Sequence, residues 1–173
     1  MLVAAAIGAG LVTLTDGGSG GPGGGIQGSM VPVAEVQTFD PIGNDGEKDD
    51  LLGAINDDDP ATAWRTEQYD TREFGGLKDG VGLVARLDRS ADLRQLSIGT
   101  PEGGWSAQLH VTDGDPPATF EGWGEPVATV EEVEAGTVDV VLDGVRGNAV
   151  LIWFTRLSPE SNARIGDIGI QGT

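Results

Sequence analysis

Residues 54–64 read AINDDDPATAW. Three successive aspartates before a proline predict a tight turn, because aspartate side chains accept hydrogen bonds from nearby backbone amides. The same carboxylates and turn carbonyls are the oxygen ligands that Ca²⁺ prefers, so a metal-binding turn is the competing interpretation. The spacing does not match an EF-hand loop, which needs glycine at its sixth position and glutamate at its twelfth. From the residues alone, both interpretations stay open.

On either side of this turn the sequence consists of short apolar runs, many with the period-two alternation that is typical of strands. Turn dipeptides such as Asp79-Gly80 and Asp143-Gly144 separate these runs. The best helical candidate is one short stretch at residues 49–55. Many short strands at this spacing predict an all-β fold, an antiparallel β-sandwich or jelly roll. The predicted strands cover residues 33–38, 81–87, 93–98, 106–111, 127–130, 137–142, 149–157 and 165–170.

The N-terminal region has a different character. Residues 2–14 (LVAAAIGAGLVTL) are uncharged, and residues 16–28 (DGGSGGPGGGIQG) form a glycine-rich run that cannot pack. The apolar run is too short to cross a bilayer, which takes about 20 residues, and it has no basic flank like that of a signal peptide. It is compatible with the outer half of a transmembrane helix that begins upstream of Met1, with a signal-like segment, or with a buried helix.

The glycine-rich run favours the first of these, because a linker of this kind rarely separates a buried helix from its own domain. We therefore expect a membrane-anchor remnant over residues 1–15, a linker over 16–30 and a β-sandwich domain over 31–173. The expected location is the cell membrane, with a single-pass anchor and the folded domain extracytoplasmic.

The excess of acidic residues disfavours anionic binding partners. The chain has 28 acidic residues against 10 Lys and Arg, a net charge of -18. Such a field repels nucleic acid and anionic lipid surfaces, so we expect no nucleic-acid partner and no membrane contact beyond the N-terminal segment. It suits divalent cations, basic partners or neutral glycans, although solubility alone is an equally good explanation.

Catalytic motifs are absent from the sequence. The one histidine, His110, is expected in the middle of a strand, and there is no cysteine and no Gly-x-Ser-x-Gly elbow. No spacing distinguishes a pair of carboxylates for glycoside hydrolysis. The sequence therefore predicts a protein that is not an enzyme.

The pattern A-I-x-D-x-D-P-x-T-x-W of residues 54–64 resembles the signature of discoidin-like domains (coagulation factor type C) in the galactose-binding-like superfamily. The run IGDIGIQG at residues 165–172 is similar to the last strand of that family, and the resemblance covers residues 33–172. It implies a galactose-binding-domain-like jelly-roll sandwich. With the apolar segment and linker, the run WRTEQY at residues 64–69 resembles the extracytoplasmic C-terminal domain of the pseudokinase-fused lipid II flippase of high-GC Gram-positive bacteria. Neither flippase nor kinase sequence is present in this chain.

The resemblance also implies a structural Ca²⁺ ion. The matching positions here are Asp57, Asp59, Thr62 and Asp167. Two departures weaken the match, because Asp58 stands where the family has glycine and Asp167 is shorter than the usual glutamate. No other cofactor is expected.

Sugar binding in this superfamily uses loops at one end of the sandwich, where aromatic rings stack on a pyranose and planar polar groups bind its hydroxyls. Arg65 and Tyr69 are the preferred pair, because both follow the Asp–Trp turn directly. The alternative for Trp105 is a place in the core, and for the arginines it is pairing with carboxylates. The full set of expected ligand residues is Arg65, Glu67, Tyr69, Trp105, Arg156 and Asn162.

Together these features predict a non-catalytic, extracytoplasmic carbohydrate-binding module at the bacterial cell envelope. The expected ligand is cell-wall glycan or a peptidoglycan precursor, which would associate the module with peptidoglycan synthesis, and membrane or envelope proteins are further expected partners. The alternative is a protein–protein docking domain of a membrane-anchored envelope protein, with no small-molecule ligand. Exposed rings at Tyr69 and Trp105 would favour glycan recognition, and buried rings would favour docking.

Overall fold

The structure, a computed structural model, describes residues 28–43 and 46–173. Every predicted strand is present, and the two pairs of runs at 81–98 and 137–157 each lie within one long strand. The predicted helical stretch is the 3-10 helix η1. The elements in chain order are β1 (Ser29–Met30), β2 (Val33–Phe39), η1 (Asp49–Ala54), β3 (Trp64–Arg65), η2 (Phe74–Gly76), β4 (Val81–Thr100), β5 (Ser106–Thr112), η3 (Phe120–Trp123), β6 (Ala128–Val130), β7 (Gly136–Arg156), β8 (Arg164–Ile165) and β9 (Asp167–Gly172).

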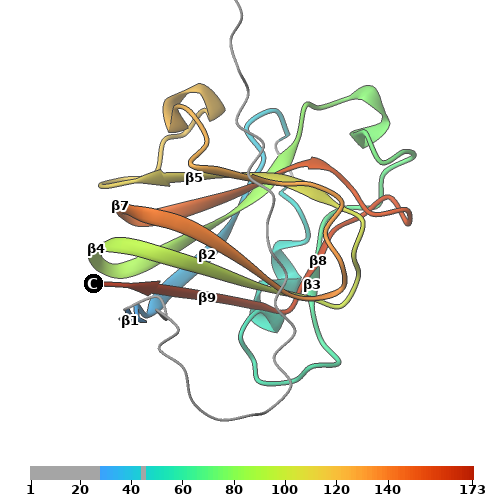
Figure 1. The fold of residues 1–173 in the computed structure, drawn as a ribbon. Helices are drawn as coiled ribbons and strands as arrows, with labels where there is room; N and C mark the ends of the chain where they lie inside the picture. Colours follow the sequence, from blue (N-terminus) through green and yellow to red (C-terminus); the bar gives the residue numbers. More distant parts are fainter. Residues whose placement is uncertain (1–27, 44–45) are drawn as a thin grey trace, which may run out of the picture.

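Two long bent strands, β4 and β7, build both layers of the sandwich. They pair antiparallel along their whole length, and the register shifts between Arg86 and Ala91 and again between Leu93 and Gln95. Layer 1 contains β2, the first half of β4, the second half of β7, β5 and β6. Layer 2 contains β1, β9, the second half of β4 and the first half of β7. Both long strands curve back at the same end, near the C-terminus (Figure 1).

Alternating side chains of both layers fill the core between them. In β4, Leu83 and Ala85 come from layer 1 and Leu96 and Ile98 from layer 2, and all four are fully buried in one cluster. This agrees with the period-two pattern of a strand that has one face in the core. Burial of these apolar side chains is the main favourable term in the stability of the domain.

A second apolar cluster covers the outer face of layer 1. Phe39 packs edge-on against both Trp123 and Trp153, with ring centroids 6.1 and 5.8 Å apart. Phe120 stacks on Trp153 at 4.4 Å and also contacts the ring of His110 at 5.2 Å. The single histidine is therefore 1% exposed, in an apolar setting rather than on the solvated strand face that its sequence context suggests.

Burial lowers the pKa of His110 below its ordinary value of 6.5, and the backbone of Gly124 and Trp123, followed by the charge of Glu125, opposes the shift. The unfolded chain then binds more protons than the folded one below about pH 6.5, so stability is lost as the pH falls through that range. We expect the urea midpoint of the native chain to fall more steeply than that of His110→Phe between about pH 7.5 and about pH 5.5. Equal slopes for the two proteins would contradict this assignment.

The short β3–β8 ribbon closes the opposite end of the sandwich (Figure 1). Trp64 pairs with Ile165, and both side chains are fully buried. The predicted strand at 165–170 is divided at Gly166, because Ile165 pairs with β3 whereas Asp167 onward pairs with β4. The Gly166 amide donates to the Gly99 carbonyl at 2.9 Å, and the Gly166 carbonyl accepts from the Asn56 amide at 2.8 Å. These bonds fix the Asp–Trp turn beside the last strand.

The expected anchor over residues 1–15 and most of the expected linker lie outside the described residues. Ser29 and Met30 pair with Gly172 and Gln171, so the sheet reaches into the end of the range expected to be linker. Among residues 28–43 and 46–173, no helix has both the length and the apolar character needed to cross a bilayer.

Candidate functional site

One face of the β3–β8 ribbon gathers residues from two distant parts of the sequence. Arg65 lies directly opposite Arg164 in the antiparallel register, and the buried Trp64–Ile165 pair points to the other side. The ladder continues beyond the strands, since the Thr66 amide donates to the Ala163 carbonyl at 3.0 Å. Glu67 and Asn162 are the next residues of the two chains beyond this hydrogen bond. We call Arg65, Glu67, Asn162 and Arg164 the β3–β8 face.

The two non-arginine members of this face are held in place by neighbours. Asn162 is 8% exposed, and its Nδ2 lies 3.2 Å from Gln68 Oε1, whereas its Oδ1 is buried with no hydrogen-bond partner among the described residues. Glu67 Oε1 forms a salt bridge of 2.8 Å with Lys48 Nζ. One carboxylate oxygen of Glu67 is therefore paired with Lys48. The side-chain oxygen of Asn162 accepts no hydrogen bond from a described residue.

Tyr69 lies beside this face and is fixed by a buried acid. Its hydroxyl donates to Glu47 Oε1, and its ring packs edge-on against Phe74 at 5.2 Å. Glu47 is fully buried, and its Oε2 accepts from the Glu67 amide at 2.8 Å. Lys78 Nζ completes the group at 3.1 Å from Glu47 Oε1 and 3.2 Å from the Tyr69 hydroxyl. The ring is half-buried, so one aromatic surface stays rigid at this end of the sandwich.

This network changes the proton affinity of two of its members. Burial, and then the hydrogen bond to Glu47, raise the pKa of the Tyr69 hydroxyl well above its ordinary value of 10.0. Burial by itself would lower the pKa of Lys78, but the hydrogen bonds to Asp40, Tyr69 and Glu47 outweigh it and raise that pKa. At neutral pH the tyrosine is therefore a hydrogen-bond donor and the lysine is charged, which suits a structural network rather than proton transfer.

Arg156 lies at the same end but is already paired. It is the last residue of β7, and its Nη1 and Nε form salt bridges with Glu132 at 2.7 Å and with Glu73 at 3.4 Å. Arg72 shares Glu132 at 3.1 Å. The alternative expectation, that arginines of this acidic domain pair with carboxylates, therefore describes Arg156.

Trp105 corrects the expectation that its ring stacks on a ligand. The indole is fully buried and packs edge-on against Phe154 at 5.3 Å. Its Nε1 donates to Thr100 Oγ1 at 3.1 Å, and the same hydroxyl lies 2.6 Å from the Arg164 carbonyl. Trp105 thus supports the β3–β8 face from beneath and does not reach the surface.

The Asp–Trp turn has the hydrogen bonds of an aspartate-capped turn. Asp57 Oδ1 accepts from the Asp59 amide at 3.0 Å, and Asp57 Oδ2 accepts from Thr62 Oγ1 at 2.7 Å. The Thr62 bond and then the Asp59 amide lower the pKa of Asp57. Asp59 Oδ1 accepts from the Ala61 amide at 2.9 Å. Asp58 has φ 63°, a left-handed conformation that explains why a glycine is common at this position in similar turns.

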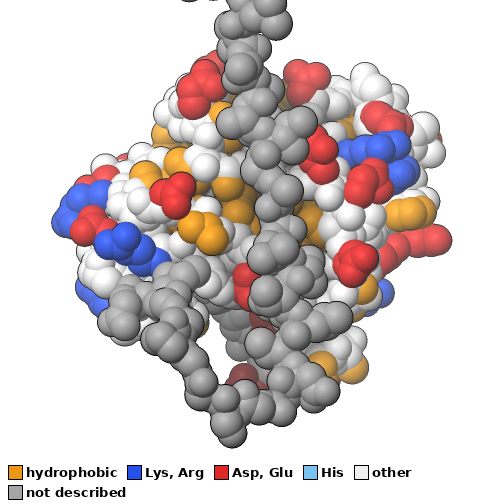
Figure 2. Space-filling model, viewed as in Figure 1, with side chains coloured by type: hydrophobic (Ala, Val, Ile, Leu, Met, Phe, Trp, Pro, Cys, Tyr) orange, Lys and Arg blue, Asp and Glu red, His pale blue; other side chains and the backbone are white. Residues whose placement is uncertain are grey.

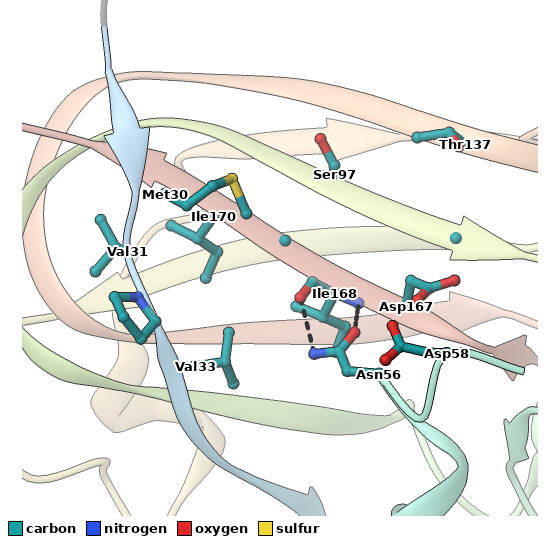
Figure 3. A pocket seen from close by; sticks show the side chains of 13 residues that line it. Met30, Val31, Val33, Asn56, Asp58, Ser97, Thr137, Asp167, Ile168 and Ile170 are labelled. Carbon is teal, nitrogen blue, oxygen red and sulfur yellow. Dashed lines mark hydrogen bonds between the residues drawn. The ribbon is translucent and has the colours of Figure 1, made fainter.

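Asp167, the fourth residue of the expected calcium set, lines a separate hollow on the outer face of layer 2. The hollow has a volume of about 490 Å³, and Asp58 also lines it (Figure 3). Asn56 forms one wall, where its side chain donates to and accepts from the backbone of Ile168 at 3.1 and 2.8 Å. No group of three acidic, histidine or cysteine side chains placed to hold a metal occurs within the described residues. The four expected ligands thus do not form one set, and calcium binding stays a prediction.

The hollow also lacks features that favour a sugar. No aromatic ring lines it, and its charged side chains are the two aspartates. Acidic side chains are spread over this view of the molecule, and basic ones gather toward the edges (Figure 2). The β3–β8 face is therefore the better candidate, because its planar hydrogen-bonding groups lie beside the fixed ring of Tyr69.

Sequence reasoning missed two residues of this end. Arg164 precedes the predicted strand at 165–170 by one position, and extending that strand toward the N-terminus would have paired it with Arg65. Glu47 is fully buried, which no pattern indicates, because an isolated acid in a loop is usually exposed. Of the six expected ligand residues, Arg65, Glu67 and Asn162 lie on the two adjacent chains of the ribbon and its continuation, and Tyr69 follows on the first of them.

No family model matches the chain. Among solved structures, the first and second CBM32 domains of ZmpB from Clostridium perfringens match with a TM-score of 0.60 and 14% identity, over 83% of this chain and 36% of that one. A chitosan-binding module of a chitosanase/glucanase from Paenibacillus sp. IK-5 gives 0.59 and 14%, over 83% and 100%. The CBM32 of AlyQ in complex with 4,5-unsaturated mannuronic acid gives 0.56 and 11%, over 82% and 97%. These likenesses confirm the all-β, galactose-binding-like sandwich.

Proposed function

We propose that this chain is a non-catalytic carbohydrate-binding module whose ligand contacts the β3–β8 face and Tyr69. The observation that carries the proposal is the antiparallel pairing that brings the segments of Arg65, Glu67 and Asn162 together at one end of the sandwich. Planar guanidinium, carboxylate and amide groups form directed hydrogen bonds with sugar hydroxyls, and a fixed aromatic ring offers an apolar surface. The shared fold with chitosan-binding and CBM32 modules supports the same function.

The proposed ligand is a cell-wall glycan or a peptidoglycan precursor, and the proposed location is the extracytoplasmic side of a bacterial membrane. The uncharged run at residues 2–14 and the glycine-rich run that follows support attachment to a membrane. The net charge of -18 argues that the sugar or peptide portion of a lipid-linked precursor is bound rather than its pyrophosphate.

Calorimetric titration of the full chain with soluble muropeptides tests this proposal. We expect saturable binding that Asn162→Ala weakens about tenfold, because the loss of one or two hydrogen bonds costs about 1.4 kcal/mol. Asn148→Ala is the matched control, since Asn148 accepts from the Gly114 amide at 2.8 Å at the opposite end of the sandwich. Absence of binding to muropeptides, or equal weakening by both variants, would contradict the proposal.

One observation favours the alternative, a protein–protein docking domain. Trp105 is fully buried, so Tyr69 is left as the aromatic ring of the candidate site, and it is only half-exposed. A docking domain would bind an envelope protein through this end without any saccharide. Pull-down of a partner by the native chain that soluble muropeptides leave unchanged, together with no muropeptide binding, would favour this alternative.

A structural calcium ion remains a further proposal. Asp57, Asp59, Thr62 and Asp167 would bind it only after Asp57 and Thr62 exchange their mutual hydrogen bond for the ion. An ion that binds the native state alone raises the unfolding midpoint by mass action. Equal unfolding midpoints in calcium and in chelator would contradict the proposed calcium site.

A further inference from the structure

We propose that Arg65 and Arg164 together bind the carboxylate of an acidic saccharide, such as a uronic acid residue. The inference rests on the proposed function, because it names the class of glycan that the β3–β8 face takes. The juxtaposition of these two arginines in one cross-strand pair is its basis.

The pair geometry brings the two guanidinium groups to the same side of the ribbon. The Thr66–Ala163 hydrogen bond makes the flanking Arg65–Arg164 pair the non-hydrogen-bonded type, in which facing side chains come closest. Like charges directly opposite one another destabilise a pair of strands. An anion between them removes this cost, because a guanidinium fork donates hydrogen bonds to both oxygens of a carboxylate.

The charge pattern of the domain makes this pair exceptional. The chain has 10 basic side chains, and 7 of them form salt bridges within the described residues. The remaining three are Arg65, Arg94 and Arg164. In a chain with 28 acidic residues, two cations in one cross-strand pair with no acid partner among residues 28–43 and 46–173 indicate a site kept open for an external anion.

Two acids at this end of the sandwich have other partners. Glu67, on the same face, forms its salt bridge with Lys48. Glu102 Oε1 accepts from Ser158 Oγ at 3.1 Å. Neither acid forms a salt bridge with Arg65 or Arg164 within the described residues.

Two buried polar atoms of this face point to a missing partner. Arg164 Nε and Asn162 Oδ1 are both buried without a hydrogen-bond partner among the described residues. Each such atom costs free energy that a partner recovers. A sugar that offers a carboxylate to the arginines and a hydroxyl to Asn162 would satisfy both after small side-chain rotations.

The whole-protein field sets a limit on the ligand. At a net charge of -18, polyanions are repelled over distances comparable to the Debye length. A sugar with a single carboxylate loses less binding free energy to this repulsion than a polyanion does. It still gains the short-range hydrogen bonds to the arginines. The site therefore fits an isolated acidic sugar better than a phosphate-rich polymer.

Calorimetry of the full chain with galacturonic acid, its neutral methyl ester and inorganic phosphate tests the proposal. We expect the acid to bind about tenfold more tightly than the ester, since charge-assisted hydrogen bonds are replaced by neutral ones. Arg65→Gln and Arg164→Gln should each remove this preference, and Arg65→Lys should retain part of it. Arg94→Gln is the control, because it removes the same charge from an exposed site near Gly144, at the other end of the sandwich.

The possible results distinguish failure of the carboxylate proposal from failure of the proposed function. Equal binding of acid and ester by the native chain, or an acid preference that survives in Arg65→Gln and Arg164→Gln, would overturn the carboxylate proposal and leave glycan binding intact. Phosphate binding as tight as that of the acid would mean a simple anion site and would overturn the saccharide class. Failure of both saccharides together with muropeptides would sink the proposed function as well.

Discussion

Replacing Lys78 with methionine is expected to lower the free energy of unfolding by about 3–5 kcal/mol. Lys78 Nζ lies 2.5 Å from Asp40 Oδ2 and 3.1 Å from Glu47 Oε1, and the side chains of these acids are only 3% and 0% exposed. Methionine fills a similar volume but leaves two buried carboxylates without a cation. Removing one partner of a buried ion pair is costly for this reason, even where the intact pair adds little.

Lys48→Met is the matched control, because Lys48 is the other lysine of the chain and its salt bridge with Glu67 is partly exposed. A pair of this kind contributes about 0–1 kcal/mol. Urea unfolding of both variants measures the difference, and adding Asp40→Asn to Lys78→Met should recover part of the loss. Similar losses for the two lysine variants would contradict the assigned role of the buried network.

Trp64→Ala is the second change with a large expected effect, a loss of about 3–5 kcal/mol in the free energy of unfolding. The indole is fully buried, stacks on Phe154 at 6.2 Å, and donates from Nε1 to the Glu47 carbonyl at 2.8 Å. Alanine would leave a cavity and an unpaired carbonyl at the junction of the β3–β8 ribbon and the core. We therefore also expect binding at the β3–β8 face to be lost with the fold of the ribbon.

Trp64→Phe separates packing from hydrogen bonding. Phenylalanine keeps much of the ring volume but leaves the Glu47 carbonyl unpaired, so the expected loss is about 1–3 kcal/mol. Denaturant unfolding gives both values. A loss below about 1 kcal/mol for Trp64→Ala would show that this turn does not anchor the domain.

The strands were predictable because apolar and polar residues alternate along them, and the apolar ones face the core between the two layers. Residues 81–87 and 93–98 were recognisable as separate strands, but their union into β4 depends on the register shift between Arg86 and Ala91, which has no signature in the sequence. The second apolar cluster, on the outer face of layer 1, was also not predicted. It buries His110, which the local alternation puts on a polar face, because the segment with Phe120 and Trp123 folds back over that face.

The candidate site was only partly predictable. Arg65, Glu67 and Tyr69 follow the Asp–Trp turn, so their position at one end follows from the turn itself. Asn162 and Arg164 come from the other strand of the ribbon, and their register with β3 is a long-range property. Trp105 follows a glycine pair in a loop, which suggests exposure, but its ring turns inward onto Phe154.

Chemical-shift mapping of the full chain during titration with a saccharide tests the central claim, that the β3–β8 face is the glycan-binding site. We expect the perturbed amides to cluster at residues 65–69 and 160–165, including Arg65, Glu67, Asn162 and Arg164. Perturbations confined to the hollow around Asp58 and Asp167, or to the bends of β4 and β7 at the opposite end, would contradict it.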